Sequence, residues 1–211
     1  MSIVLGIDTA GPVVGACLLG PNVDREWSER VARGADTVLI PAIADMIEHG
    51  QPLDAVAVSV GPGAFTGLRV GVSAALGIAF SRGISVVCVS SLEARAALVR
   101  EQSVLALLDA RKSRVYAQWF DCSTAIPRPR NAPQDAPLES VIPEQSFVAV
   151  GEGALLDPEC IVGAGGVICN DPAQSAARSV ARLGQVRMAE GMPPHDVALA
   201  YLRDADAKKQ V

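Results

Sequence analysis

Two aspartates could carry chemistry in this chain because of where they stand. Asp8 and Asp109 each end a short apolar segment, at residues 3–8 and 104–109, and each begins a tight turn. Carboxylates placed in this way can hold a magnesium ion. Buried strands also often end at an aspartate that only begins a turn. The two acids could therefore mark a nucleotide site or be simple turn residues.

A glycine-rich loop at residues 59–71 is the second candidate. Backbone N–H groups in such a loop attract phosphate, but this one lacks the Lys-Ser/Thr of a Walker loop and is not GxGxxG. Gly63, Gly67 and Gly71 are four residues apart, and a glycine costs a helix about 1 kcal/mol relative to alanine. This spacing predicts the close approach of another helix, which belongs either to a partner chain or to residues 39–47 of this chain.

Metal and redox chemistry have less support. The two histidines, His49 and His195, are 146 positions apart, whereas imidazole ligands on one helix face need a separation of three or four. The five cysteines are an odd number without a CxxC pair, which is typical of buried free thiols. We expect no metal and no cofactor to be bound by this chain alone.

The composition predicts a globular protein. Half of the 211 residues are hydrophobic, yet no stretch approaches the roughly 18 consecutive apolar residues of a membrane span. The first residues lack the basic region of a signal peptide, so we expect a cytoplasmic protein with no membrane contact. A net charge of −5 and 4% aromatic residues are unlike an RNA binder that works alone, which would carry a basic face.

The candidate residues have to be positioned by two halves that begin alike. Apolar runs and helical periodicity predict a βββαβα unit in the first half, with helices at 36–49 and 66–82. The expected strands of that half are 3–8, 13–19, 22–29, 54–60 and 84–89. The second half repeats the opening with strands at 104–109 and 115–120, then has a proline-rich segment at 122–143, a strand at 147–150 and a helix at 173–190.

Duplication of one unit explains these two similar openings better than chance does. The expected fold class is α/β, an actin-like (ASKHA, ribonuclease H-like) duplication of βββαβα units with a degenerate second half. We place the N-terminal subdomain at 1–100 and the C-terminal subdomain at 101–211. The unit resembles the actin, sugar-kinase and Hsp70 ATPase folds, in which two aspartate-led turns face each other and grip ATP phosphates and magnesium.

The loop Gly61-Pro-Gly-Ala-Phe-Thr-Gly-Leu-Arg-Val-Gly71 resembles the signature of the TsaB (YeaZ) family, which is related to TsaD and the glycoprotease-like proteins. Three shorter segments occur in the order that the family shows: Leu5-Gly-Ile-Asp-Thr9, Leu108-Asp-Ala-Arg111 and Tyr201-Leu-Arg203. One departure is Ala64, where the family commonly has serine. The resemblance covers nearly the whole chain and implies the actin-like fold.

The resemblance also implies a function. Such a chain would be a non-catalytic subunit of the complex that forms N6-threonylcarbamoyladenosine beside the anticodon of tRNAs reading codons that begin with adenine. It would bind and activate a TsaD-type catalytic subunit together with a TsaE-type ATPase. ATP and metal would belong to those partners, and tRNA would be bound only through the complex. A homodimer through the same helices is an alternative association, and a stand-alone small ATPase or kinase is the alternative function.

Two sets of site residues follow from these expectations. A vestigial nucleotide site would comprise Asp8, Thr9 and Asp109, since the first turn contains Pro12, which has no N–H, and the second has no glycine. The partner-binding residues would lie on the two N-terminal helices. These are Leu39, Ile43, Met46, Gly63, Thr66, Gly67, Arg69, Val70, Gly71 and Ala74. The basic residues Arg111, Lys112 and Arg114 either contact tRNA or only solvate their turn.

Overall fold

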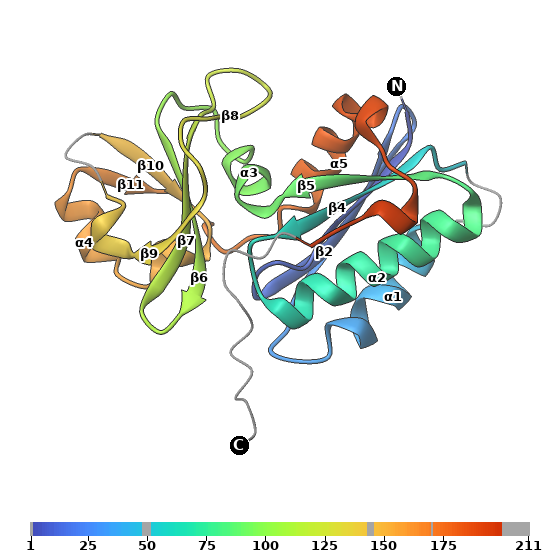
Figure 1. Ribbon diagram of the computed structural model, residues 1–211, viewed down its shortest axis with the longest axis horizontal. Coiled ribbons are helices and arrows are strands. Elements are labelled where there is room, and N and C mark those ends of the chain that lie inside the picture. The colour runs from blue at the N-terminus through green and yellow to red at the C-terminus, as the bar shows by residue number, and fades with distance from the viewer. Residues whose placement is uncertain (1, 48–51, 143–145, 170, 200–211) are drawn as a thin grey trace.

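The computed structural model describes residues 2–47, 52–142, 146–169 and 171–199, and it consists of two lobes, each built on one β-sheet (Figure 1). We call them the first lobe and the second lobe. His49 and the segment 201–203 lie outside the described residues.

The first lobe has a five-stranded sheet in the order β3-β2-β1-β4-β5. Its strands are β1 (Val4–Asp8), β2 (Val13–Gly20), β3 (Val23–Arg30), β4 (Ala55–Gly61) and β5 (Ser85–Ser90). The central strand β1 is antiparallel to β2 and parallel to β4. Every residue of β1 and β4 is buried, as expected for strands covered by helices on both faces.

Helices α1 (Ala35–Met46) and α2 (Phe65–Arg82) lie side by side on one face of this sheet, and α5 (Ala177–Val186) covers the other face (Figure 1). Side chains of β1 alternate between the two layers: Leu5 and Ile7 pack with α1 and α2, whereas Val4 packs with α5. Helix α2 ends at Gly83, whose left-handed backbone is typical of a helix C-terminus.

The second lobe repeats this strand order. Its sheet runs β11-β10-β6-β7-β8, so that β6 takes the place of β1, being antiparallel to β7 and parallel to β10. Its strands are β6 (Val104–Arg111), β7 (Arg114–Asp121), β8 (Arg128–Pro129), β9 (Gln134–Pro137), β10 (Phe147–Val150) and β11 (Gly166–Ile168). The matching order of the two sheets confirms the predicted actin-like, duplicated α/β fold.

The second lobe is the degenerate copy. Where the first lobe has α1 and α2, the described residues of the second form short 3-10 helices, η1 (Leu138–Ser140) and η2 (Glu152–Leu155), and the six-residue α4 (Pro158–Gly163). The predicted loop at 122–143 contains two short strands, β8 and β9, which pair with β7. The two remaining 3-10 helices, η3 (Met188–Glu190) and η4 (Pro194–Asp196), follow α5.

The last helix of each half packs on the sheet of the other half. Helix α3 (Ser91–Ala96) follows β5 and packs against β6 and β7, while α5 returns from the end of the chain to β1, β2 and β4. The first lobe is therefore completed by residues 177–186. The division at residue 100 remains a prediction.

Two predicted features differ in detail. The helix expected at 173–190 is shorter, with α5 covering ten residues. Helix α3 was not predicted, because all six of its residues are buried and its polar members, Glu93 and Arg95, hide a helical apolar pattern. Among the described residues, no helix is long and apolar enough to cross a bilayer.

Candidate functional site

Asp8 lies at the end of β1 with none of its surface exposed. One of its carboxylate oxygens, Oδ1, accepts hydrogen bonds from the Ser59 hydroxyl at 2.5 Å, the Ala10 N–H at 3.3 Å and the Arg95 guanidinium at 3.3 Å. The other, Oδ2, accepts the N–H of Ala176 at 3.0 Å and pairs with Arg95 at 3.1 Å. Both oxygens are thus fully used by partners within the chain.

Arg95 joins Asp8 to the second lobe. It comes from α3 and is 1% exposed, and its Nη1 also donates to the Ser91 carbonyl oxygen at 3.1 Å. Its Nε lies 3.8 Å from a carboxylate oxygen of Glu152, the first residue of η2. Glu152 in turn accepts a hydrogen bond from the backbone N–H of Asp109. The two aspartate-led turns are therefore linked through one guanidinium and one carboxylate, which we call the interlobe cluster.

Burial and the Arg95 charge set the protonation of this cluster. Burial alone would raise the pKa of Asp8, but the Arg95 charge and the hydrogen bonds from Ser59 and Ala176 outweigh it and hold that pKa below its ordinary value. For Glu152 burial is the larger effect, so its pKa is raised although Arg95 opposes the shift. Asp8 is thus the preferred counter-ion of Arg95.

The glycine-rich loop closes over the turn that follows Asp8. A side chain at Gly67 would collide with the Thr9 carbonyl oxygen, one at Gly71 with the Thr9 hydroxyl, and one at Gly63 with the backbone of Ala10. The close approach predicted from the glycine spacing is real, but its partner is neither another chain nor helix α1. The N-terminal turns of α2 instead lie directly against the turn between β1 and β2.

The second turn has no such cover. The Asp109 side chain is about a quarter exposed, accepts the Arg111 N–H at 2.7 Å and pairs with the Arg111 guanidinium at 3.2 Å. Arg111, Lys112 and Ser113 all have positive φ angles, a conformation that usually needs glycine. Arg114 pairs with Asp135 at 2.6 Å. The basic residues of this turn are thus engaged locally, at least in part.

These contacts decide what the predicted nucleotide residues can do. Asp8 and Thr9 are both fully buried, and the Thr9 hydroxyl has no hydrogen-bond partner among the described residues. A magnesium ion needs carboxylate oxygens that are free to coordinate it. Asp109 retains solvent access, but Asp8 offers no free oxygen. The arrangement suits a fixed connection between the lobes better than phosphate chemistry.

The residues predicted to bind a partner divide into two groups. Five of them are buried against the sheet of this chain and present no side chain to a partner: Leu39, Ile43, Met46, Gly71 and Ala74. We therefore expect no direct side-chain contact between these five and a partner, because the first three and Ala74 fill the core between the helices and the sheet and Gly71 packs on Thr9. The others, Gly63, Thr66, Gly67, Arg69 and Val70, are at least partly exposed, and partner binding by them remains a prediction.

The outer face of α1 and α2 carries apolar residues that the sequence pattern did not single out. Ile40 is 48% exposed and Phe80 is 82% exposed. Gly77, one helical turn before Phe80, would have no atom of the described chain within 4 Å of an added Cβ. The spacing of residues in α2 could have suggested this face. Ser73, Gly77 and Phe80 follow Arg69 at intervals of three or four residues and form one exposed stripe along the helix. We call this stripe with Ile40 the outer helix face.

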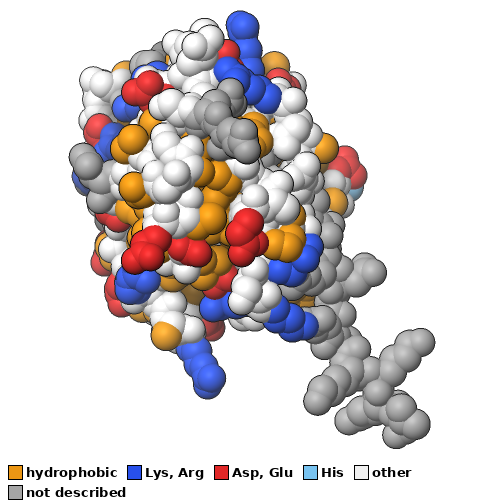
Figure 2. Space-filling view, turned by 90° about the vertical axis from the view of Figure 1, so that its left-hand side faces the viewer, with side chains coloured by type: hydrophobic (Ala, Val, Ile, Leu, Met, Phe, Trp, Pro, Cys, Tyr) orange, Lys and Arg blue, Asp and Glu red, His pale blue; other side chains and the backbone are white. Residues whose placement is uncertain are grey.

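The second lobe also exposes hydrophobic residues. Val162 and Val167 are each 61% exposed, and Leu155 and Leu156 about half exposed. Figure 2 looks onto this end of the molecule and shows hydrophobic side chains gathered in a shallow hollow, with acidic side chains beside it. Exposed apolar residues thus occur on both lobes, and exposure alone does not assign a partner to either.

Fold and site together define a two-lobed, actin-like chain whose two aspartate-led turns are linked by the interlobe cluster. Comparisons with known proteins agree with this class. The structure of YeaZ from Pseudomonas aeruginosa is similar with a TM-score of 0.81 and 25% identity, covering 96% of this chain and all of that one. A family model described as TsaD, tRNA N6-adenosine threonylcarbamoyltransferase, matches residues 27–122.

Sequence relatives identify the family. The tRNA threonylcarbamoyladenosine biosynthesis protein TsaB of Bacillus subtilis is 29% identical over 69% of this chain and 62% of its own length. The chain therefore spans less than two thirds of that relative. An uncharacterized protein of Mycobacterium bovis is 36% identical over 64% of this chain and 67% of its own length. The chain belongs to the TsaB (YeaZ) family.

Proposed function

We propose that this chain takes part in the biosynthesis of threonylcarbamoyladenosine in tRNA as a non-catalytic subunit that binds and activates a TsaD-type catalytic subunit. The similarity to proteins named for this pathway supports the pathway. A TsaE-type ATPase would be the further partner, and tRNA would be bound only through the assembled complex.

The interlobe cluster supports a non-catalytic role. Catalysis in ATPases of this fold needs two turns that admit phosphate and magnesium. In this chain the oxygens of Asp8 are occupied by Arg95, Ser59 and Ala176, and the turn after Asp8 is covered by α2. Nucleotide chemistry would then fall to the partners.

The outer helix face is the observation that carries the proposed association. A glycine in an exposed helix costs about 1 kcal/mol relative to alanine, and Gly77 recovers nothing from packing within the described chain. Phe80 beside it exposes most of its ring. A close helix–helix contact with another chain would use both features, since the glycine admits a second backbone and the ring fills the space next to it.

Such a contact fits a partner of the same fold. Helices α1 and α2 lie in parallel on one face of the first lobe (Figure 1). A second actin-like chain that offered the same two helices would form a four-helix contact. A TsaD-type partner and a second copy of this chain would then compete for one surface, the first as a pseudo-symmetric pair and the second as an isologous one.

Copurification tests this proposal. The tagged chain would be expressed with the TsaD protein of the same genome, as wild type and as Gly77→Leu. We expect the wild type to retain TsaD and Gly77→Leu to lose it while unfolding at the same or a higher temperature, because the new side chain points into solvent and leucine favours a helix more than glycine does. Val162→Asp on the second lobe is the matched control and should retain TsaD. Loss of binding by the control alone would contradict the assigned face.

A further inference from the structure

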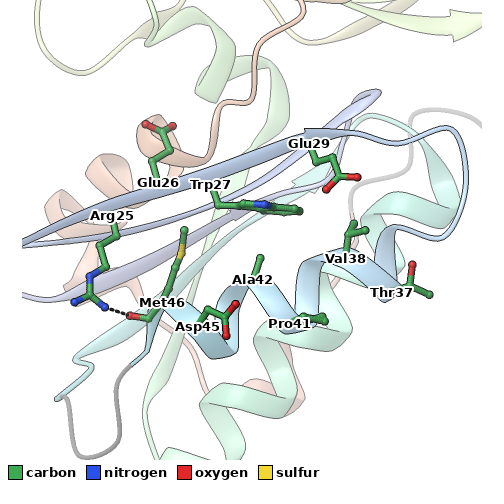
Figure 3. A pocket seen from close by; sticks show the side chains of 10 residues that line it. All are labelled: Arg25, Glu26, Trp27, Glu29, Thr37, Val38, Pro41, Ala42, Asp45 and Met46. Carbon is green, nitrogen blue, oxygen red and sulfur yellow. Dashed lines mark hydrogen bonds between the residues drawn. The ribbon is translucent and has the colours of Figure 1, made fainter.

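A groove about 480 Å³ in volume lies beside the outer helix face, between the edge strand β3 and helix α1 (Figure 3). It forms because β3 is the outermost strand of the first sheet and α1 packs mainly over β2. Pro41 lines the groove and directly follows Ile40 of the outer helix face. The groove is therefore continuous with the surface proposed to bind TsaD.

The wall of the groove is apolar. Side chains of β3 alternate between the two faces of the sheet, which directs Trp27 toward α1. In Figure 3 the indole of Trp27 lies above α1 close to Ala42 and Val38. The ring is half-buried, so part of its surface remains open to the groove.

The rim of the groove carries more acidic than basic side chains. Glu29 and Asp45 are both exposed, and neither carboxylate forms an ion pair or hydrogen bond with any residue that the structure describes. Glu26 points away from the groove in Figure 3 and pairs with Arg178 at 2.7 Å. The Arg25 guanidinium donates to the Met46 carbonyl oxygen at 3.1 Å, at the C-terminal end of α1. Two carboxylates, those of Glu29 and Asp45, therefore face the groove without an ion pair to the described residues, while the Arg25 charge is held at the end of α1.

We propose that this groove receives a basic side chain, an arginine or a lysine, from the TsaD-type partner. A cation is attracted to the face of an indole, and a planar guanidinium stacks on it while donating to nearby carboxylates. Trp27 supplies the ring, and Glu29 and Asp45 supply the acceptors. The inference rests on the proposed function, because the partner reaches the groove only if it binds the outer helix face.

The test measures the affinity of the purified chain for TsaD at low and at physiological ionic strength, by calorimetric titration. The double variant Glu29→Gln/Asp45→Asn should bind about fivefold more weakly at low ionic strength and lose most of its salt dependence. Trp27→Leu should weaken binding by about threefold at both ionic strengths. Asp36→Asn is the matched control, since Asp36 is an exposed acid of α1 outside the groove, and it should bind as the wild type does.

Gly77→Leu separates the two proposals. If Gly77→Leu abolishes binding while the double variant keeps the affinity and salt dependence of the wild type, the groove inference is wrong and the proposed interface stands. If neither variant alters binding, the interface and the groove inference both fail. Weaker self-association of the double variant, with TsaD binding unaltered, would assign the groove to a second copy of this chain and overturn the inference. Circular dichroism checks that each variant is folded, and the double variant alters only exposed side chains.

Discussion

Near the C-terminal ends of β1 and β6, the two lobes place an aspartate on equivalent strands of the same sheet order, yet in opposite surroundings. Asp8 has no exposed surface, and its carboxylate is contacted by five donor groups: two of Arg95, the Ser59 hydroxyl and two backbone amides. Asp109 faces solvent in part and pairs with Arg111 of its own turn. The first turn is a connection between the lobes, while the second is a surface hairpin.

This difference shows how a duplicated unit can keep its strand order while its two turns differ in burial and in partners. The strands and their register survive in both lobes because buried apolar side chains fix them. The turns between those strands are less constrained, because they lie outside the buried apolar pattern. In the first lobe an arginine from the connecting helix α3 is the counter-ion of the aspartate.

Removing the two carboxylates one at a time should produce the largest contrast. Asp8→Asn leaves Arg95 buried with only Glu152 nearby, and we expect a loss of about 3–5 kcal/mol in the free energy of unfolding. Asp109→Asn should change it by less than about 0.5 kcal/mol, because its ion pair is exposed. Urea denaturation of both variants measures the difference. Equal effects would show that the two turns are not distinct in the way described.

A second contrast separates the covered turn from the open side of α2. Gly71→Ala should cost about 1–3 kcal/mol, because the added methyl group meets the Thr9 side chain and the helix must shift away from the turn. Gly77→Ala, six residues along the same helix, should instead stabilise the isolated chain by about 0.5–1 kcal/mol. Thermal unfolding of the two variants, measured side by side, should give shifts of opposite sign. A stabilising Gly71→Ala would contradict the close contact.

The turn of the second lobe should respond to relief of backbone strain. Ser113 has φ near 56°, where glycine is favoured over any L-residue. Ser113→Gly should stabilise the chain by about 0.5 kcal/mol, because relief of strain exceeds the added freedom of the unfolded state. Ser73→Gly on the exposed face of α2 is the control and should destabilise by about the same amount. Calorimetry of both variants tests this, and destabilisation by Ser113→Gly would count against a strained turn.

The smallest effect should be a pH dependence that belongs to the interlobe cluster. The folded-state pKa of Asp8 is below its ordinary 3.8, so its stabilisation is present above pH 3.8 and is lost as the pH falls. The folded-state pKa of Glu152 is above its ordinary 4.5, so stability should decline as the pH rises from 4.5 through that raised pKa. Urea midpoints measured across this range should show the decline in the wild type and lack it in Glu152→Gln. The same decline in the variant would assign it to other groups.

The sequence predicted the framework well, because its strands are continuous apolar runs whose burial leaves little choice of structure. Val4 to Ile7 and Val104 to Leu108 are buried, and they form the central strand of each sheet. The pairing of Arg95 with Asp8 could not be predicted, since these residues are 87 positions apart. They meet only because α3 lies between the two lobes. A charged residue in a short helix would ordinarily be placed in solvent.

The partner-binding face illustrates a different limit. Small residues at a spacing of four indicate a close contact but not its direction, and in α2 Gly71 faces inward while Gly77 faces outward. The predicted set therefore contains core residues such as Leu39 and omits Ile40, which follows it directly in the same helix. Only the position of the helix relative to the sheet decides which of two adjacent apolar residues is buried.

The return of α5 to the first sheet has a consequence for how the protein is made. Strands β1 to β5 leave the ribosome early, but the helix that covers Val4, Ala57 and Val87 is encoded near the other end of the chain. At ordinary elongation rates this helix follows on the order of ten seconds later. During that interval one apolar face of the nascent sheet is exposed to solvent. We therefore expect ribosome-associated chaperones to bind the nascent chain until α5 emerges.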